Sequence, residues 1–151
     1  MVYKLFIKLI LLIALTSCGY SPIYSSLEDQ RLNIEILEHE GDRQINLEII
    51  SKLNFHDNEQ SDLIKLSINT YYKKNDLTKS LTGEIEQYQI EAQTTYSIIT
   101  KSSKKTFTNT ETFIMKNLDD DFEERNYEKK MKSNIADLNY RKLMTQLQRL
   151  K

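Results

Sequence analysis

The chain has 151 residues, and its 21 basic and 22 acidic side chains leave a net charge of −1. This length suits one domain with a hydrophobic core of its own. The charge balance argues against a nucleic-acid-binding protein, which would usually present a net basic face. The chain has only three glycines and one proline, so turns should be few and the helices and strands long.

The first 17 residues have the order of a secretory signal peptide. Basic residues come first, an unbroken apolar run follows from residue 9 to residue 15, and small residues end the segment. The run is far shorter than the roughly 20 residues that a membrane-spanning helix needs. The Leu-Thr-Ser-Cys sequence at residues 15–18 resembles the bacterial lipobox. That resemblance implies cleavage after Ser17 and acylation of Cys18.

Cys18 is the single cysteine of the chain, so it has no disulfide partner within it. The alternative is an ordinary signal peptide followed by a chance cysteine. Each buried methylene contributes about 0.8 kcal/mol and one acyl chain anchors only marginally, so stable anchoring would take several chains on Cys18. We expect residues 1–17 to be a lipoprotein signal peptide, 18–30 an acylated cysteine with a tether, and 31–151 a single domain. The tether either packs on the domain or is a free spacer.

The first half of the domain predicts a strand, a helix and a second strand. Residues 31–38 alternate between apolar and polar, which is typical of a half-buried strand. Asp42 is a candidate N-cap for a helix over residues 42–55. Alternation returns at residues 64–70, and residues 71–76 would lead into a turn. The apolar residues expected to be buried here are Leu32, Ile34, Ile36, Ile45, Ile49, Leu53, Ile64, Leu66 and Ile68.

Two more strands and a long helix should follow. Residues 83–100 alternate without a break, residues 101–105 form a turn, and residues 106–116 are a strand by propensity. Either Phe107, Phe113 and Met115 or Ile114 and the threonines would be buried in that last strand. Residues 122–150 contain no glycine or proline and predict a helix. Its expected apolar stripe is Met131, Ile135, Leu138, Leu143, Leu147 and Leu150.

The predicted order is therefore β-α-β-β-β-α. Consecutive strands with a helix on each side favour an α+β fold, in which two helices pack on one face of a four-stranded, mainly antiparallel sheet.

The whole chain resembles LptE, the small outer-membrane lipoprotein family of lipopolysaccharide assembly. The resemblance rests on the Cys-Gly-aromatic-x-Pro-aliphatic-Tyr sequence at residues 18–24, similar to alphaproteobacterial members, on the β-α-β-β-β-α order, and on the charged run at residues 124–128. In that family the domain sits inside and supports a large β-barrel, LptD, and the pair moves lipopolysaccharide to the cell surface. The resemblance implies the same partner and a lipid-anchored place on the periplasmic side of the outer membrane. It implies no catalytic activity and no cofactor.

The polar face of the strand over residues 83–100 suits the wet interior of a barrel. The alternative is that this face simply meets water, as one side of an antiparallel sheet commonly does. A lipid-anchored periplasmic binding module with another ligand is the second function that the sequence allows. The polar side chains concerned are Gln87, Gln89, Gln93, Thr95 and Ser97.

A lipopolysaccharide binder should offer clustered cations to phosphate and acidic sugars. Lys73 and Lys74 after the second strand, and Lys101, Lys104 and Lys105 after the third, are the candidates. Lysine binds phosphate as a point charge. The alternative is that these lysines lie in ordinary surface turns, where they promote solubility.

No pattern of catalytic chemistry is present. The sequence has no HExxH, no paired cysteines, no glycine-rich phosphate loop and no G-x-S-x-G. His39 and His56 lie in polar surroundings and should be exposed loop residues. The run Asp119-Asp120-Asp121 could bind a divalent cation, but it better suits a helix N-terminus. We expect no enzyme and no metal site.

Overall fold

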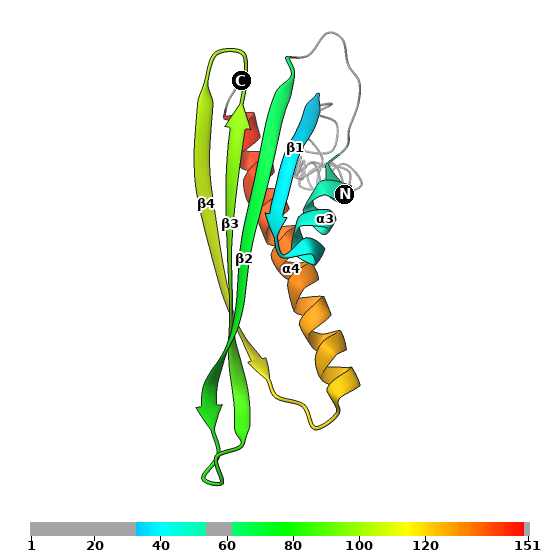
Figure 1. The fold of residues 1–151 in the computed structure, drawn as a ribbon, viewed down its shortest axis with the longest axis vertical. Coiled ribbons are helices and arrows are strands. Elements are labelled where there is room, and N and C mark those ends of the chain that lie inside the picture. Colours follow the sequence, from blue (N-terminus) through cyan, green and yellow to red (C-terminus); the bar gives the residue numbers. More distant parts are fainter. Residues whose placement is uncertain (1–32, 54–61, 150–151) are drawn as a thin grey trace, which may run out of the picture. The chain divides into compact units, whose positions relative to one another are not determined.

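Four strands and two helices make up the part of the chain that this computed structural model describes, residues 33–53 and 62–149. The interpretations of residues 1–30, of Leu32, of His56 and of Leu150 lie outside the described residues. In chain order the elements are β1 (Ile34–Gly41), α3 (Arg43–Lys52), β2 (Ile64–Lys79), β3 (Ile85–Ile99), β4 (Lys104–Lys116) and α4 (Asp121–Gln148) (Figure 1).

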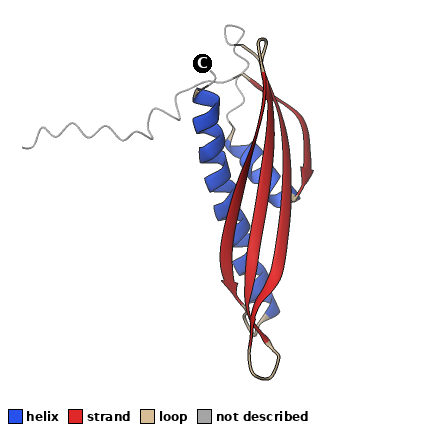
Figure 2. Cartoon of the chain, turned by 90° about the vertical axis from the view of Figure 1, so that its left-hand side faces the viewer, coloured by secondary structure: helices blue, strands red, loops and turns tan. Residues whose placement is uncertain are grey.

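The strands form one sheet in the order β1-β2-β3-β4. β1 runs parallel to β2, whereas β2, β3 and β4 are antiparallel neighbours. A parallel pair needs a crossover, and α3 provides it. Both helices lie on the same face of the sheet (Figure 2). The predicted α+β fold is confirmed. No helix among the described residues is long and apolar enough to cross a membrane.

The core lies between the sheet and the two helices, and alternation along the strands decides which side chains are buried in it. Ile90, Ala92, Tyr96 and Ile98 of β3 are buried, as predicted. The register settles the open question in β4, because Phe113 lies opposite Ile90 on the buried side. Phe107, Phe113 and Met115 therefore share the face under the helices, and the threonines and Ile114 lie on the other.

The predicted apolar stripe of α4 included one residue, Leu138, that is not part of the buried face. Leu138 is 36% exposed, whereas Asn139 beside it is fully buried. The reason is that Ile135, Asn139, Leu143 and Leu147 follow each other at intervals of four, one helix face, and Leu138 lies to one side of it. The buried residues of α4 are Met131, Ile135, Ala136, Asn139, Leu143, Met144 and Leu147.

β1 continues further than the sequence predicted, so His39 is a strand residue and not a loop residue. It is exposed, and it lies opposite Ile68 of β2. Pairing with β2 as far as Gly41 holds this charged segment extended. The register shifts between Ile36 and Glu38, and this bulge leaves the intervening Leu37 46% exposed.

The junction between β1 and α3 depends on two adjacent residues. The Asp42 carboxylate accepts a hydrogen bond from the backbone N–H of Ile45 at 3.0 Å, which confirms the predicted N-cap. Gly41 has a φ of 84°, and a Cβ atom there would lie 2.0 Å from the carbonyl oxygen of Thr70. That carbonyl accepts a bond from the Asp42 N–H at 2.8 Å. Only glycine fits this close approach.

Candidate functional site

The turn between β3 and β4 is shorter than predicted, and it contains one of the three predicted lysines. The Thr100 N–H donates to the Ser103 carbonyl at 2.8 Å, with Lys101 between them. Lys104 and Lys105 already belong to β4, since they pair with the last residues of β3. Neighbouring strand residues point to opposite faces, so these two exposed side chains diverge.

Lys101 has an acidic partner. Its Nζ lies 2.6 Å from Oδ1 of Asp62, which precedes β2, and both side chains are largely exposed. An exposed pair of this kind contributes at most about 1 kcal/mol. Lys101 is therefore accessible, with its charge partly balanced by Asp62.

Lys73 and Lys74 do not follow the second strand but lie inside it. β2 extends to Lys79, because β3 supplies backbone partners as far as the pair Lys79 and Ile85. This ladder holds a polar sequence extended that would read as a turn by itself. Lys73 is exposed, whereas the Lys74 side chain is only 22% exposed and points to α4.

Lys74 belongs to an ionic cluster that joins β2 to the N-terminal half of α4. Its Nζ lies 2.8 Å from Oε1 of Glu124 and 3.2 Å from Oε2 of Glu128. The Tyr72 hydroxyl donates to the other oxygen of Glu128 at 2.9 Å. The Lys74 Nζ also lies 4.1 Å from the centre of the Tyr88 ring, at cation–π distance.

Lys132 extends the ionic cluster to α3. Its Nζ lies 2.7 Å from Oδ2 of Asp42, the N-cap of α3, and 3.8 Å from Oε1 of Glu128. It also lies 4.1 Å from the centre of the Tyr72 ring. The Lys132 and Asp42 side chains are 18% and 12% exposed. One continuous set of charges thus ties β2, α3 and α4 together.

Proton affinities in the ionic cluster follow from burial and charge. Burial, together with the hydrogen bond and charge of Glu128, raises the pKa of Tyr72 above its usual range. Burial alone would lower the pKa of Lys74, but hydrogen bonds to Glu124 and Glu128 outweigh it and the pKa rises. Burial alone would raise the pKa of Glu124, but bonds from Lys74 and from the Leu118 N–H lower it. At neutral pH Lys74 and Glu124 are charged and Tyr72 is neutral.

Sequence reasoning missed this cluster, although a signal for it existed. Glu124, Glu128 and Lys132 recur at intervals of four in the last helix and so lie on one face. The acidic run before them behaves as predicted, since Asp120 caps α4 by accepting bonds from the N–H groups of Phe122 and Glu123. Among the described residues no three His, Cys, Asp or Glu side chains are grouped to hold a metal.

The face of β2, β3 and β4 that points away from the helices, here called the open face, carries three consecutive cross-strand rows without a charged side chain. Cross-strand rows on it join Asn69, Thr95 and Thr108, whose neighbours Thr70 and Thr94 are buried on the other side. The hydroxyls of Thr95 and Thr108 are 2.9 Å apart. The three uncharged rows consist of Ser67, Ser97 and Thr106, of Asn69, Thr95 and Thr108, and of Tyr71, Gln93 and Thr110. The next row pairs Lys73 with Glu91 and Thr112, and Asn75, Gln89 and Ile114 follow it.

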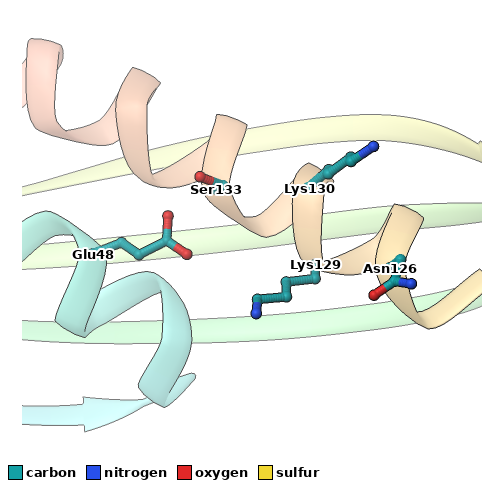
Figure 3. A pocket seen from close by; sticks show the side chains of 5 residues that line it. All are labelled: Glu48, Asn126, Lys129, Lys130 and Ser133. Atoms are coloured by element: carbon teal, nitrogen blue, oxygen red, sulfur yellow. The ribbon is translucent and has the colours of Figure 1, made fainter.

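A shallow pocket of about 430 Å³ lies where α3 meets α4 (Figure 3). Its walls are Glu48, Asn126, Lys129, Lys130 and Ser133. Figure 3 shows Lys130 pointing away from the α3 side, so the two lysines do not converge on one group. The Gln44 side chain, nearby on α3, donates to Glu48 at 2.9 Å and to the backbone carbonyl of Lys129 at 3.1 Å.

These features define a class of protein: an α+β domain with one parallel crossover and an antiparallel β2-β3-β4 meander under two helices. A solved structure with this fold is the rare lipoprotein B of Shewanella oneidensis, which is 11% identical with a TM-score of 0.55 and is matched over 77% of this chain and 98% of that chain. A candidate lipoprotein of Caulobacter crescentus is also 11% identical, with a TM-score of 0.53 over 87% of this chain and 98% of that one. At this identity the likeness concerns the fold. No protein-family model and no curated protein matches the sequence.

Proposed function

We propose that this chain is an outer-membrane lipoprotein, anchored through Cys18, that supports and plugs an LptD-like β-barrel during lipopolysaccharide transport to the cell surface. The lipobox-like segment at residues 15–18 and the LptE-like order of elements support this proposal. So does the fold, which the chain shares with a rare lipoprotein B.

The observation that carries the proposal is the open face. Its central rows are made of hydroxyl and amide side chains, and no described helix covers them (Figure 2). Barrel interiors are polar and wet, so a plug needs a surface that exchanges hydrogen bonds without burying unpaired charge. Threonine, serine, asparagine and glutamine meet that requirement.

A photo-crosslinking residue at Thr95 or Gln89, in cells that make the acylated full chain, tests the contact. We expect both positions to capture an outer-membrane barrel several times the size of this chain. The matched control is Thr145, an exposed threonine of α4 on the helix side of the sheet. Capture of no barrel from either open-face position, or equal capture from Thr145, would contradict the proposed orientation.

The anchor is tested separately. Cys18→Ala should leave an uncleaved or soluble precursor, and the wild-type chain should incorporate labelled palmitate. Outer-membrane fractionation of the variant, together with failure of the wild type to take up label, would contradict acylation at Cys18.

Lipopolysaccharide contact is proposed for the exposed lysines. Lys101 lies in the turn between β3 and β4, Lys104 and Lys105 begin β4 on opposite faces, and Lys73 lies apart in β2. Charge reversal of Lys101, Lys104 and Lys105 together should weaken lipopolysaccharide binding by the mature chain, and added salt should weaken lipopolysaccharide binding by the wild type. Lys73→Glu is the single-site comparison. Lys74 is unsuited to such a test, since its reversal would disrupt the ionic cluster.

The second candidate function is a lipid-anchored binding module for another ligand. The pocket beside Glu48 and Lys129 is the observation that favours it, because a carboxylate and an ammonium group together suit a small zwitterionic molecule. The module would function without a barrel. Glu48→Gln should then abolish the biological role, whereas crosslinks from Thr95 should find no barrel.

A further inference from the structure

The two edges of the sheet are β1 and β4. Within residues 33–53 and 62–149, each pairs with a neighbour on one side only. An edge strand presents unpaired backbone groups that can accept another strand, and proteins usually protect such edges with charges or bulges.

β1 has both kinds of protection. Glu35, Glu38 and Glu40 are exposed along it, and the bulge at Leu37 interrupts its register. β4 has neither in its central part. Its pairing with β3 runs without a register shift, and the sequence Thr-Phe-Thr-Asn-Thr over residues 106–110 contains no charged side chain.

The hydrogen-bond pattern shows which residues of β4 present their backbone to the free edge. At one end of the β3-β4 pair Thr100 N–H donates to Ser103, and at the other Asn117 N–H donates to Glu86. In both cases an odd-numbered residue on the β4 side bonds to β3. Antiparallel pairs alternate strictly, and no shift intervenes. The even-numbered residues therefore point their N–H and C=O groups outward: Thr106, Thr108, Thr110 and Thr112.

We propose that β4 pairs with β4 of a second copy of this chain, antiparallel and centred on Thr108. In this register Thr106 bonds to Thr110 of the partner subunit through outward backbone groups on both strands. Lys105 comes opposite Glu111 of the partner subunit at both ends of the contact. A two-residue shift either way puts Lys105 opposite Asn109 or Phe113 of the partner subunit, so only the centred register pairs these charges.

The side chains at the edge fit this arrangement. Lys105 is exposed and has no ion pair among the described residues, and Glu111 already binds Lys142 from one side. The dimer would place a second cation on Glu111 and join the two open faces into one continuous polar surface. This inference does not depend on the proposed function: the pair of copies and a single copy seated in a barrel would be alternative states of the chain.

A disulfide across the two-fold axis tests the pairing. In the full chain with Cys18→Ser, purified in mild detergent, Thr108→Cys should form a symmetric disulfide on oxidation, because residues that face each other across such a pair have Cα atoms about 5.5 Å apart. The matched control is Thr95→Cys, which lies opposite Thr108 on the same face. Its two copies would be separated by three strand spacings, roughly 14 Å, beyond the reach of a disulfide.

Two variants test the pairing without a crosslink. Thr108→Pro removes an outward N–H that β3 does not use, so sedimentation should show loss of the dimer with unchanged circular dichroism. Lys105→Glu should weaken the dimer more than Lys104→Glu, since Lys104 comes opposite the uncharged Thr112 of the partner subunit. The proposal is overturned if the wild-type chain is monomeric at every concentration, if the Thr108 and Thr95 cysteines crosslink equally, or if the Thr108 cysteine captures a different protein in cells and not its own copy.

Discussion

Gln93, Thr94, Thr95 and Tyr96 are consecutive residues of β3, and they alternate between two different surroundings. Thr94 and Tyr96 are fully buried under the helices, whereas Gln93 and Thr95 lie on the open face. The helix face combines an apolar core with an ionic cluster at one end. The open face has neither, although it uses the same strands. Stability should therefore depend on one face, and the other is free to meet a partner.

The largest loss in the free energy of unfolding should come from a substitution in the core under α4. Ile135 is fully buried, so Ile135→Ala should lower the free energy of unfolding by about 3 kcal/mol through lost burial and the cavity left behind. Urea denaturation of the mature chain measures it. Leu138→Ala, three residues on and 36% exposed, is the matched control and should cost clearly less. Equal losses would mean that the stripe runs as the sequence alone predicts.

A substitution in the ionic cluster should cause the next largest loss in the free energy of unfolding. Lys132→Ala removes the cation at 2.7 Å from the Asp42 carboxylate and leaves that acid largely buried. We expect a loss of about 2 kcal/mol in the free energy of unfolding, the range for a hydrogen bond to a charged group. Lys130→Ala, exposed on the same helix, should change it by less than about 0.5 kcal/mol. A negligible effect of Lys132→Ala would show that the cluster does not stabilise the contact between α3 and α4.

The same cluster should make the helix face sensitive to acid. Because folding lowers the pKa of Glu124 from its usual 4.5, the carboxylate stabilises the fold above that pH. This contribution disappears as the pH falls through the lower, folded-state pKa. Glu124→Gln should therefore flatten the decline of stability on the acid side of pH 4.5, as measured by urea denaturation in a pH series. An unchanged acid slope would remove Glu124 from this account.

The smallest changes in stability should come from replacing Gln93 on the open face and from removing the Tyr96 hydroxyl on the helix face. The Tyr96 hydroxyl is buried with no hydrogen-bond partner among the described residues. Tyr96→Phe removes a group that is desolvated without compensation, so the variant should be as stable as the wild type or slightly more stable. Gln93→Ala on the open face should stay within about 0.5 kcal/mol. A loss above 1 kcal/mol in Tyr96→Phe would mean that the hydroxyl is hydrogen-bonded in solution.

The order of elements and the facing of β3 could be predicted from the sequence because alternation with a period of two and the helical period are local properties. The same holds for the caps at Asp42 and Asp120, since a carboxylate that accepts N–H groups two or three residues ahead needs nothing distant. Which side chains of β4 lie on the buried face could not be predicted in this way. Phe107 and Phe113 compete there with Ile114, and only the register against β3 decides between them.

The lysines show the same distinction between what local sequence predicts and what tertiary contacts decide. Their number and spacing are plain in the sequence, but Lys74 lies in a strand only because β3 pairs with β2 to its end. Its charge is balanced only because α4 brings Glu124 and Glu128 within 3.2 Å. Long-range pairing also decides which residues of β4 present their backbone to the free edge. The sequence by itself thus determined which residues alternate, cap and cluster, because those patterns act over a few residues. Which charges meet and which edge stays open was decided by the tertiary structure, because these depend on contacts between residues up to 90 positions apart.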